Sequence, residues 1–132
     1  MTENWSPHEL ERMDAATELH IAVKRTNGTL HRWTPIWLVC ADGEVYVRTW
    51  YRRDTGWFGH ALRARKARIR VPGLEADAVV EDVGEGTAGL RERIDTAYRN
   101  KYGSSGSSSM VGATAAATTL RLSPEPKMRS DC

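Results

Sequence analysis

The sequence predicts an α+β fold in which six short antiparallel strands form a closed or partly closed β-barrel with flanking helices. Several segments alternate apolar and polar residues, which is the period of a half-buried strand. Tight-turn pairs, among them Asn27-Gly28, Asp42-Gly43 and Pro72-Gly73, join these segments and favour antiparallel pairing. A barrel is favoured over an open sheet because closure leaves no unpaired strand edge.

Size and composition are those of an ordinary globular protein. The chain has 132 residues, and we expect one domain over residues 1–124, followed by a disordered tail at 125–132. The net charge is only +2, which gives no support for nucleic-acid binding. The two cysteines lack disulfide or metal-ligand spacing and indicate a reducing compartment. No apolar run is long enough to span a membrane, so we expect a cytoplasmic protein.

The first elements follow from local signals. Residues 6–9, Ser-Pro-His-Glu, predict a helix start, because the serine can cap the helix and the glutamate completes a capping box. Residues 19–24 alternate and predict the first strand. The Asn27-Gly28 turn then leads into an antiparallel second strand over about 29–40.

Pro35 interrupts this second strand between Trp33 and Trp37. Proline removes a ladder hydrogen bond and is normally kept out of strand interiors. A regular strand would point both tryptophans to the same face, but a bulge at Pro35 would separate them. We interpret the segment as the rim of a ligand pocket at the barrel edge.

The remaining elements continue the same alternation of strands and turns. Residues 44–50 predict a third strand, and the sequence "WFGHALRAR" at 57–65 predicts a short helix. Apolar residues at helical spacing predict an amphipathic helix over about 90–101. The last three strands are expected at 67–71, 75–83 and 118–124.

Aromatic side chains are the first candidates for ligand contacts. Four of the five tryptophans fall between positions 33 and 57, and flat aromatic faces stack well on a planar ring. The alternative is that these side chains fill the core and a subunit interface. They are Trp33, Trp37, Trp50 and Trp57.

Basic side chains are the second candidates. Arg48 lies on a predicted strand, where its guanidinium suits bidentate binding of a phosphate, and the neighbouring Thr49 suits a ligand hydroxyl. The alternative for Arg48 is a surface ion pair. A basic stretch follows, which is more often a solvated face than an anion site. It comprises Arg52, Arg53, Arg63, Arg65, Lys66, Arg68 and Arg70.

No residue is identified as catalytic from the sequence. The four histidines lack partners at ligand spacing, so we expect no metal site. There is no glycine-rich phosphate loop and no nucleophile elbow. Asp95, Tyr98 and Lys101 lie near one face of the late helix and could reach a site, although Tyr98 is more typical of a packed residue.

Five segments of the chain, in order and spacing, resemble a family of small uncharacterised proteins of actinobacterial type in the FMN-binding split-barrel superfamily. They are "TNGTLHRWTPIWLV", "GEVYVRTW", "GWFGHALRARKARIRV", "IDTAYRNKYG" and "ATTLRLSP", and the resemblance covers roughly residues 5–124. That superfamily includes pyridoxamine-phosphate oxidases, flavin reductases and deazaflavin-dependent nitroreductases. A pattern between Gly28 and Leu62 is also similar to the deazaflavin branch.

The resemblance implies a six-stranded antiparallel split barrel, usually a homodimer with FMN in a groove between subunits. By position, it implies that the segment Thr34, Pro35, Ile36 and Trp37 edges the flavin ring. It further implies that Arg48 and Thr49 hold the phosphate and ribityl chain, with Arg53 or Lys66 helping. The candidates for the substrate pocket are Trp33, Trp50, Trp57 and Tyr98.

Three functions are compatible with these features. The first is a flavin- or deazaflavin-dependent oxidoreductase that acts on a small planar organic substrate. The set of phosphate ligands is sparser than in the oxidase branch, which favours a second candidate, a cofactor-free biosynthetic isomerase, cyclase or lyase. There a histidine, Asp95 or Tyr98 would act as acid or base in the same aromatic pocket. The third is a non-catalytic ligand-binding module.

Overall fold

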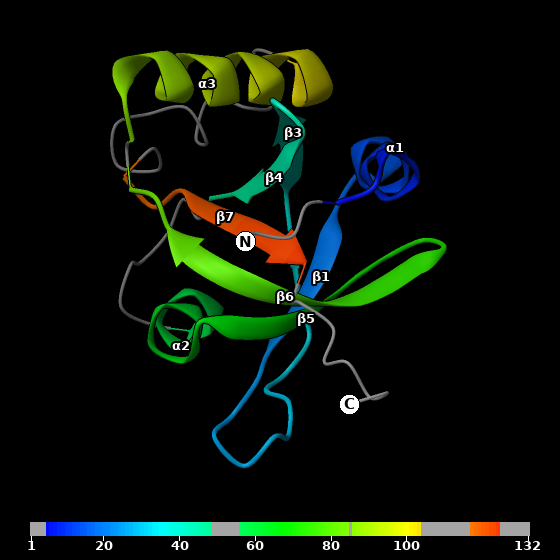
Figure 1. Cartoon of the computed structure of the whole chain (residues 1–132), viewed down its shortest axis with the longest axis vertical. Coiled ribbons are helices and arrows are strands. Elements are labelled where there is room, and N and C mark those ends of the chain that lie inside the picture. The colour runs from blue at the N-terminus through cyan, green and yellow to red at the C-terminus, as the bar shows by residue number, and fades with distance from the viewer. Residues whose placement is uncertain (1–4, 49–55, 85, 104–116, 125–132) are drawn as a thin grey trace, which may run out of the picture.

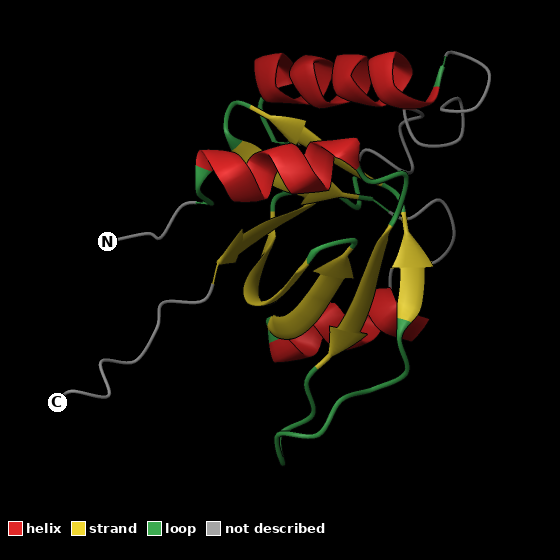
Figure 2. Cartoon of the chain, turned by 90° about the vertical axis from the view of Figure 1, so that its right-hand side faces the viewer, coloured by secondary structure: helices red, strands yellow, loops and turns green. Residues whose placement is uncertain are grey.

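Seven antiparallel strands form one sheet that curls into a nearly closed barrel, with three helices around it in the part described (Figures 1 and 2). The computed structural model describes residues 5–48, 56–84, 86–103 and 117–124, so the expected tail at 125–132 lies outside it. The elements in chain order are α1 (Pro7–Ala15), β1 (Leu19–Val23), β2 (Thr34–Ile36), β3 (Leu38–Ala41), β4 (Glu44–Val47), α2 (Gly56–Ala64), β5 (Lys66–Val71), β6 (Leu74–Asp82), α3 (Ala88–Tyr102) and β7 (Leu120–Pro124).

The strand order brings the two edges of the sheet together. The order is β2-β1-β5-β6-β7-β4-β3, so the edge strands are β2 and β3, which only Trp37 separates in the sequence. The predicted second strand at 29–40 is therefore two strands, and the expected count of six is wrong by one. Pro35 lies in the edge strand β2, with its side chain exposed, where a missing N–H is tolerated.

A β-bulge precedes Pro35. Thr34 pairs with Ile21, and Leu30 bridges Lys24. Between these two pairings, the hairpin has three residues on this strand, 31–33, opposite two residues on β1. One extra residue bends a strand and redirects its side chains. Pro35 itself pairs regularly with His20, so the bulge predicted at Pro35 is wrong, and the extra residue lies at 31–33 instead.

Local signals at the start of α1 and at one hairpin are confirmed. The Ser6 hydroxyl accepts a hydrogen bond from the Glu9 N–H (3.1 Å), and the Glu9 carboxylate accepts one from the Ser6 N–H (2.8 Å). This is the predicted capping box. Asp42 and Gly43 have φ values of 54° and 77°, as a two-residue type I′ turn between β3 and β4 requires.

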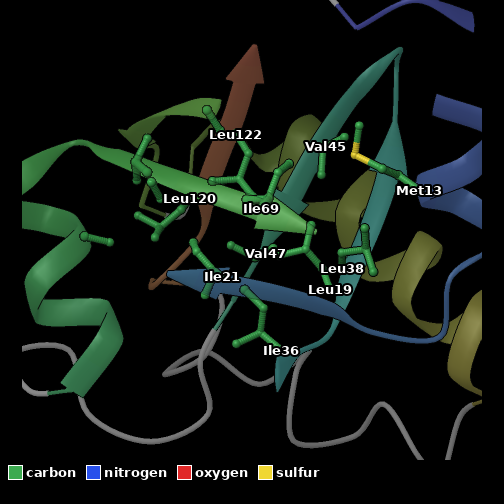
Figure 3. Close-up of a cluster of buried hydrophobic side chains, with 14 of the residues drawn as sticks. Met13, Leu19, Ile21, Ile36, Leu38, Val45, Val47, Ile69, Leu120 and Leu122 are labelled. Atoms are coloured by element: carbon green, nitrogen blue, oxygen red, sulfur yellow. The ribbon is translucent and has the colours of Figure 1, made fainter. Parts of the chain in front are cut away.

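Apolar side chains from the strands fill the barrel interior, as Figure 3 shows. Met13 of α1 and Phe58 of α2 close this core from two sides. A second, smaller cluster lies beneath α3, which packs against β3 at the end of the barrel opposite α2 (Figure 1). None of the helices in the described ranges has the length and hydrophobicity of a membrane-spanning segment.

Candidate functional site

Strand β5 carries three basic side chains on the outer face of the barrel. Ala67, Ile69 and Val71 are buried in the core, and the alternate residues Lys66, Arg68 and Arg70 are exposed or half-buried. This alternation is the period of two that places successive side chains on opposite faces of a sheet. Part of the basic stretch in the sequence is therefore an ordered row of cations along one strand.

Pairing with the neighbouring strands extends this row across the sheet. His20 of β1 is paired with both Arg70 of β5 and Pro35 of β2, so the three residues lie side by side. The Arg70 guanidinium lies over the Trp33 ring, 4.3 Å from the ring centroid, in a cation–π contact. We refer to this set as the outer basic face. It comprises His20, Trp33, Pro35, Lys66, Arg68 and Arg70.

Carboxylates of β6 neutralise part of the outer basic face. Asp77 accepts hydrogen bonds from Arg68 (3.1 Å) and from Lys24 (3.0 Å). The bond to Asp77 raises the pKa of Arg68. Partial burial alone raises the pKa of Asp77, but the two hydrogen bonds outweigh it, so this pKa is lowered. The ion pair of Arg70 with Glu75 is longer, at 4.0 Å, so Glu75 neutralises Arg70 less than Asp77 neutralises Arg68.

A groove opens beside this face. It has a volume of about 540 Å³ and lies between the start of β1 and the β5–β6 turn, where Glu18, His20, Arg70 and Pro72 contribute to its walls. A second groove of about 420 Å³ lies between Pro72 and α1. Both volumes are in the range of small-molecule sites. The first groove is lined by His20, Arg70 and Glu18, whose carboxylate lies 3.9 Å from the Nε2 atom of His20.

Arg48 lies in the interior and not on the outer basic face. Its Nη1 atom is 2.6 Å from the Asp95 carboxylate, and its Nε donates to the Thr119 hydroxyl at 2.8 Å. The ion pair considered for Arg48 exists, but it is buried rather than at the surface. The predicted phosphate role of Arg48 stays a prediction, and the guanidinium is directed toward Asp95 in this structure.

Three other predicted site residues also face the interior or α3. Ile36 is part of the barrel core. Trp37 stacks on Tyr102 of α3 with a centroid distance of 4.2 Å, and its carbonyl accepts a hydrogen bond from the Tyr98 hydroxyl at 3.3 Å. Tyr98 is completely buried, and desolvation raises the pKa of its hydroxyl. Trp33 and Trp37 therefore have separate partners on opposite sides of the chain.

The structure brings together Trp33 and Pro35 from the predicted set, with Thr34 half-buried beside them, whereas Lys66 lies at the other end of β5 from Arg70. Thr49, Trp50 and Arg53 lie outside the described residues. Trp57 falls in α2, but its side chain is outside the described part as well.

Sequence analysis did not single out His20, and it named Arg70 only within the basic stretch. The alternation of basic and apolar residues in "KARIRV" is the signal that could have placed Arg70 on an outer face. Arg70 lies opposite His20 because β1 pairs with β5, and no local sequence pattern predicts that pairing. Within the described ranges, no three histidine, cysteine or acidic residues are grouped to hold a metal ion.

The family of this chain follows from its sequence. A family model described as "uncharacterized protein conserved in bacteria" (DUF2255) matches residues 9–122. The chain belongs to the DUF2255 family. No curated protein matches the sequence of this DUF2255 member.

Solved structures share its fold. The haem storage protein HutZ of Vibrio cholerae has a TM-score of 0.66, with 94% of this chain and 92% of that chain covered at 14% identity. A conserved hypothetical protein of Mycobacterium tuberculosis has a TM-score of 0.61 (96% and 84% covered, 14% identity). An FAD-binding protein of Mesorhizobium loti has a TM-score of 0.60 (96% and 94% covered, 14% identity). The DUF2255 chain thus has the same fold as these three proteins.

Proposed function

We propose that the protein binds a flavin, either FMN or a deazaflavin, at the outer basic face and acts as an oxidoreductase on a small planar organic substrate. The observation that carries this proposal is the Arg70 guanidinium held over the Trp33 ring, beside a groove of about 540 Å³. The FAD-binding protein that shares the fold supports the choice of ligand class.

The residues of the outer basic face fit the two chemical parts of a flavin nucleotide. Trp33 and Pro35 offer flat apolar surface for the ring, to which aromatic side chains are suited. Arg70 offers positive charge for the phosphate, and an arginine fork can bind it bidentately. When bound, the flavin would supply the transfer of a hydride or of electrons.

The protein's own contribution would be binding, orientation and proton handling. His20 lines the groove, and an imidazole is a side chain suited to proton transfer. We assign it the role of holding or moving a proton at the substrate. We also propose a homodimer with the groove at the subunit boundary, which sedimentation of the purified protein tests.

A fluorescence titration tests the flavin proposal. Wild-type protein should quench FMN or deazaflavin fluorescence at micromolar concentration. The change Arg70→Ala should weaken binding about tenfold or more, because a charge-assisted contact contributes about 1.5–3 kcal/mol. Arg99→Ala removes an exposed arginine of α3 and should leave the affinity unchanged. Protein that binds neither flavin contradicts the proposal and leaves the cofactor-free enzyme and the binding module as explanations.

Haem is the second candidate ligand, and His20 favours it. An imidazole in an open groove suits axial ligation of haem iron, and the adjacent Arg70 suits a propionate. The haem storage protein with the same fold supports this alternative. Titration with haem should then give a Soret shift that His20→Ala abolishes. A shift that persists in this variant rules His20 out as the ligand.

A further inference from the structure

A second group of basic side chains lies where the β1–β2 hairpin meets α2. His31, in the bulge, and His60, on α2, stack with their ring centroids 3.9 Å apart and their planes at 16°. The Arg63 Nη2 atom lies 3.0 Å from His60 Nδ1. Arg25 lies across the hairpin, where its Nη1 donates to the Thr29 hydroxyl at 3.3 Å and to the Leu30 carbonyl at 3.1 Å. Two elements far apart in the sequence thus present two imidazoles and two guanidiniums together.

The hydrogen bond to Arg63 indicates which ring nitrogen of His60 carries the proton. A guanidinium can only donate, so His60 Nδ1 accepts and the ring proton is on Nε2. For His31, desolvation and the neighbouring His60, Arg25 and Arg63 all lower the pKa, which favours the neutral form of its ring. The groups that face His31 are thus basic ones, contributed by both the hairpin and α2.

We propose that His31, His60, Arg25 and Arg63 form a binding site for a phosphate-type dianion, separate from the flavin site. Arginine forks are the side chains best matched to phosphate oxygens, and a dianion would offset the repulsion between the two guanidiniums. The hydrogen bonds within the hairpin hold Arg25 in place, and the position of Arg63 one turn after His60 fixes the other guanidinium on the helix. The site is in this sense assembled before the ligand arrives.

This site should couple anion binding to proton uptake. A bound dianion favours the charged form of His31, so the bound protein holds its proton at a higher pH than the free protein does. By linkage, affinity for the anion must rise as the pH falls through the range in which His31 titrates. If the stack of His31 and His60 only holds the hairpin against α2, the protein should show no anion affinity that rises as the pH falls.

Titration of the full chain with inorganic phosphate, followed by NMR of the histidine Cε1–H signals, tests the site. Phosphate should shift the signals of His31 and His60 and raise the titration midpoint of His31. Sulfate, which stays a dianion from pH 6 to pH 8, should bind more tightly at pH 6 than at pH 8. Arg63→Gln and Arg25→Gln should each weaken binding about tenfold. Both side chains are exposed, so the variants should fold normally. Arg99→Gln, an exposed arginine on α3, is the charge-matched control and should bind as wild type does.

Phenyl phosphate distinguishes a phosphate ester from free phosphate as the natural source. Tighter binding of the ester assigns the site to an organic phosphate, and equal binding assigns it to the free anion. The proposal is overturned if neither probe shifts the histidine signals at millimolar concentration, or if Arg99→Gln weakens binding as much as Arg63→Gln. Riboflavin, which lacks a phosphate, separates this result from the flavin proposal, because it should bind the outer basic face and leave His31 unchanged.

Discussion

The guanidinium of Arg48 lies 2.6 Å from the carboxylate of Asp95, and this contact joins the residue after β4 to α3 across 47 positions of the sequence. Arg48 is completely buried, and Asp95 is 8% exposed. Arg48 also donates to Thr119, which directly precedes β7. One arginine therefore connects the sheet to the helix that covers its β3 edge.

Removal of one partner from this pair should destabilise the protein strongly. We expect Arg48→Ala to lower the free energy of unfolding by about 3 kcal/mol, because it removes the nearer partner of the buried Asp95 carboxylate and leaves the longer pair with Arg91 at 3.6 Å. Urea unfolding followed by circular dichroism measures this change. The control is Arg93→Ala, which breaks an exposed pair with Asp42 and should cost less than about 1 kcal/mol. Equal effects of the two changes would show that the buried pair does not anchor α3.

Tyr102 should anchor the end of α3 through its hydroxyl. This oxygen accepts from the Leu38 N–H at 3.2 Å and lies within donating distance of the carbonyls of Thr17 (2.7 Å) and Leu38 (2.9 Å). The change Tyr102→Phe keeps the ring stacked on Trp37 but removes these bonds, and we expect a loss of about 1–2 kcal/mol in unfolding free energy. Chemical denaturation measures it. A variant as stable as wild type would show that the stacked ring alone holds the helix.

The same hydroxyl should make stability fall at high pH. Desolvation raises the pKa of Tyr102 to about 12, from an ordinary value of about 10. Because the folded state holds this proton more tightly than the unfolded state, the contribution is complete below pH 10 and is lost as the pH rises to 12. The stability difference between wild type and Tyr102→Phe should therefore shrink over this window. A difference that stays constant in denaturation curves from pH 9 to 12 contradicts the assignment.

The two tryptophans beside Pro35 should respond differently to substitution. Trp37 packs on α3, so Trp37→Ala should lower the free energy of unfolding by about 2 kcal/mol. Trp33 contacts Arg70 on the outer face, so Trp33→Ala should cost less than about 1 kcal/mol but weaken FMN binding several-fold. Thermal unfolding and fluorescence titration of both variants separate the two roles. If Trp37→Ala folds but loses affinity for FMN, while Trp33→Ala keeps it, the flavin binds on the α3 side of the barrel.

Local chemistry made most elements of the fold predictable. The capping box at Ser6 and the turn at Asp42-Gly43 involve neighbouring residues, and the sequence displays them directly. The division of the predicted second strand did not follow from the sequence, because it depends on how the two edges of the sheet meet around Trp37. The alternation of apolar and polar residues alone could not show that the predicted second strand contributes a strand to each edge of the sheet.

The residues of the site were harder to predict than the fold, because their positions also depend on pairings between distant segments. Arg48 and Tyr98 have side chains suited to a ligand, but pairings with α3 and with the chain before β3 bury them. Arg70 and His20 become neighbours only when β1 and β5 pair. Residue type indicated the available chemistry, and the long-range pairings determined which of these groups reach the surface.

The position of β7 has a consequence for synthesis on the ribosome. This strand lies between β6 and β4 in the sheet, although it follows α3 in the chain. While residues 120–124 are still inside the exit tunnel, β6 and β4 of the nascent chain have no partner on their facing edges. Open edges of this kind recruit other strands, so this interval is when the protein has most need of a chaperone.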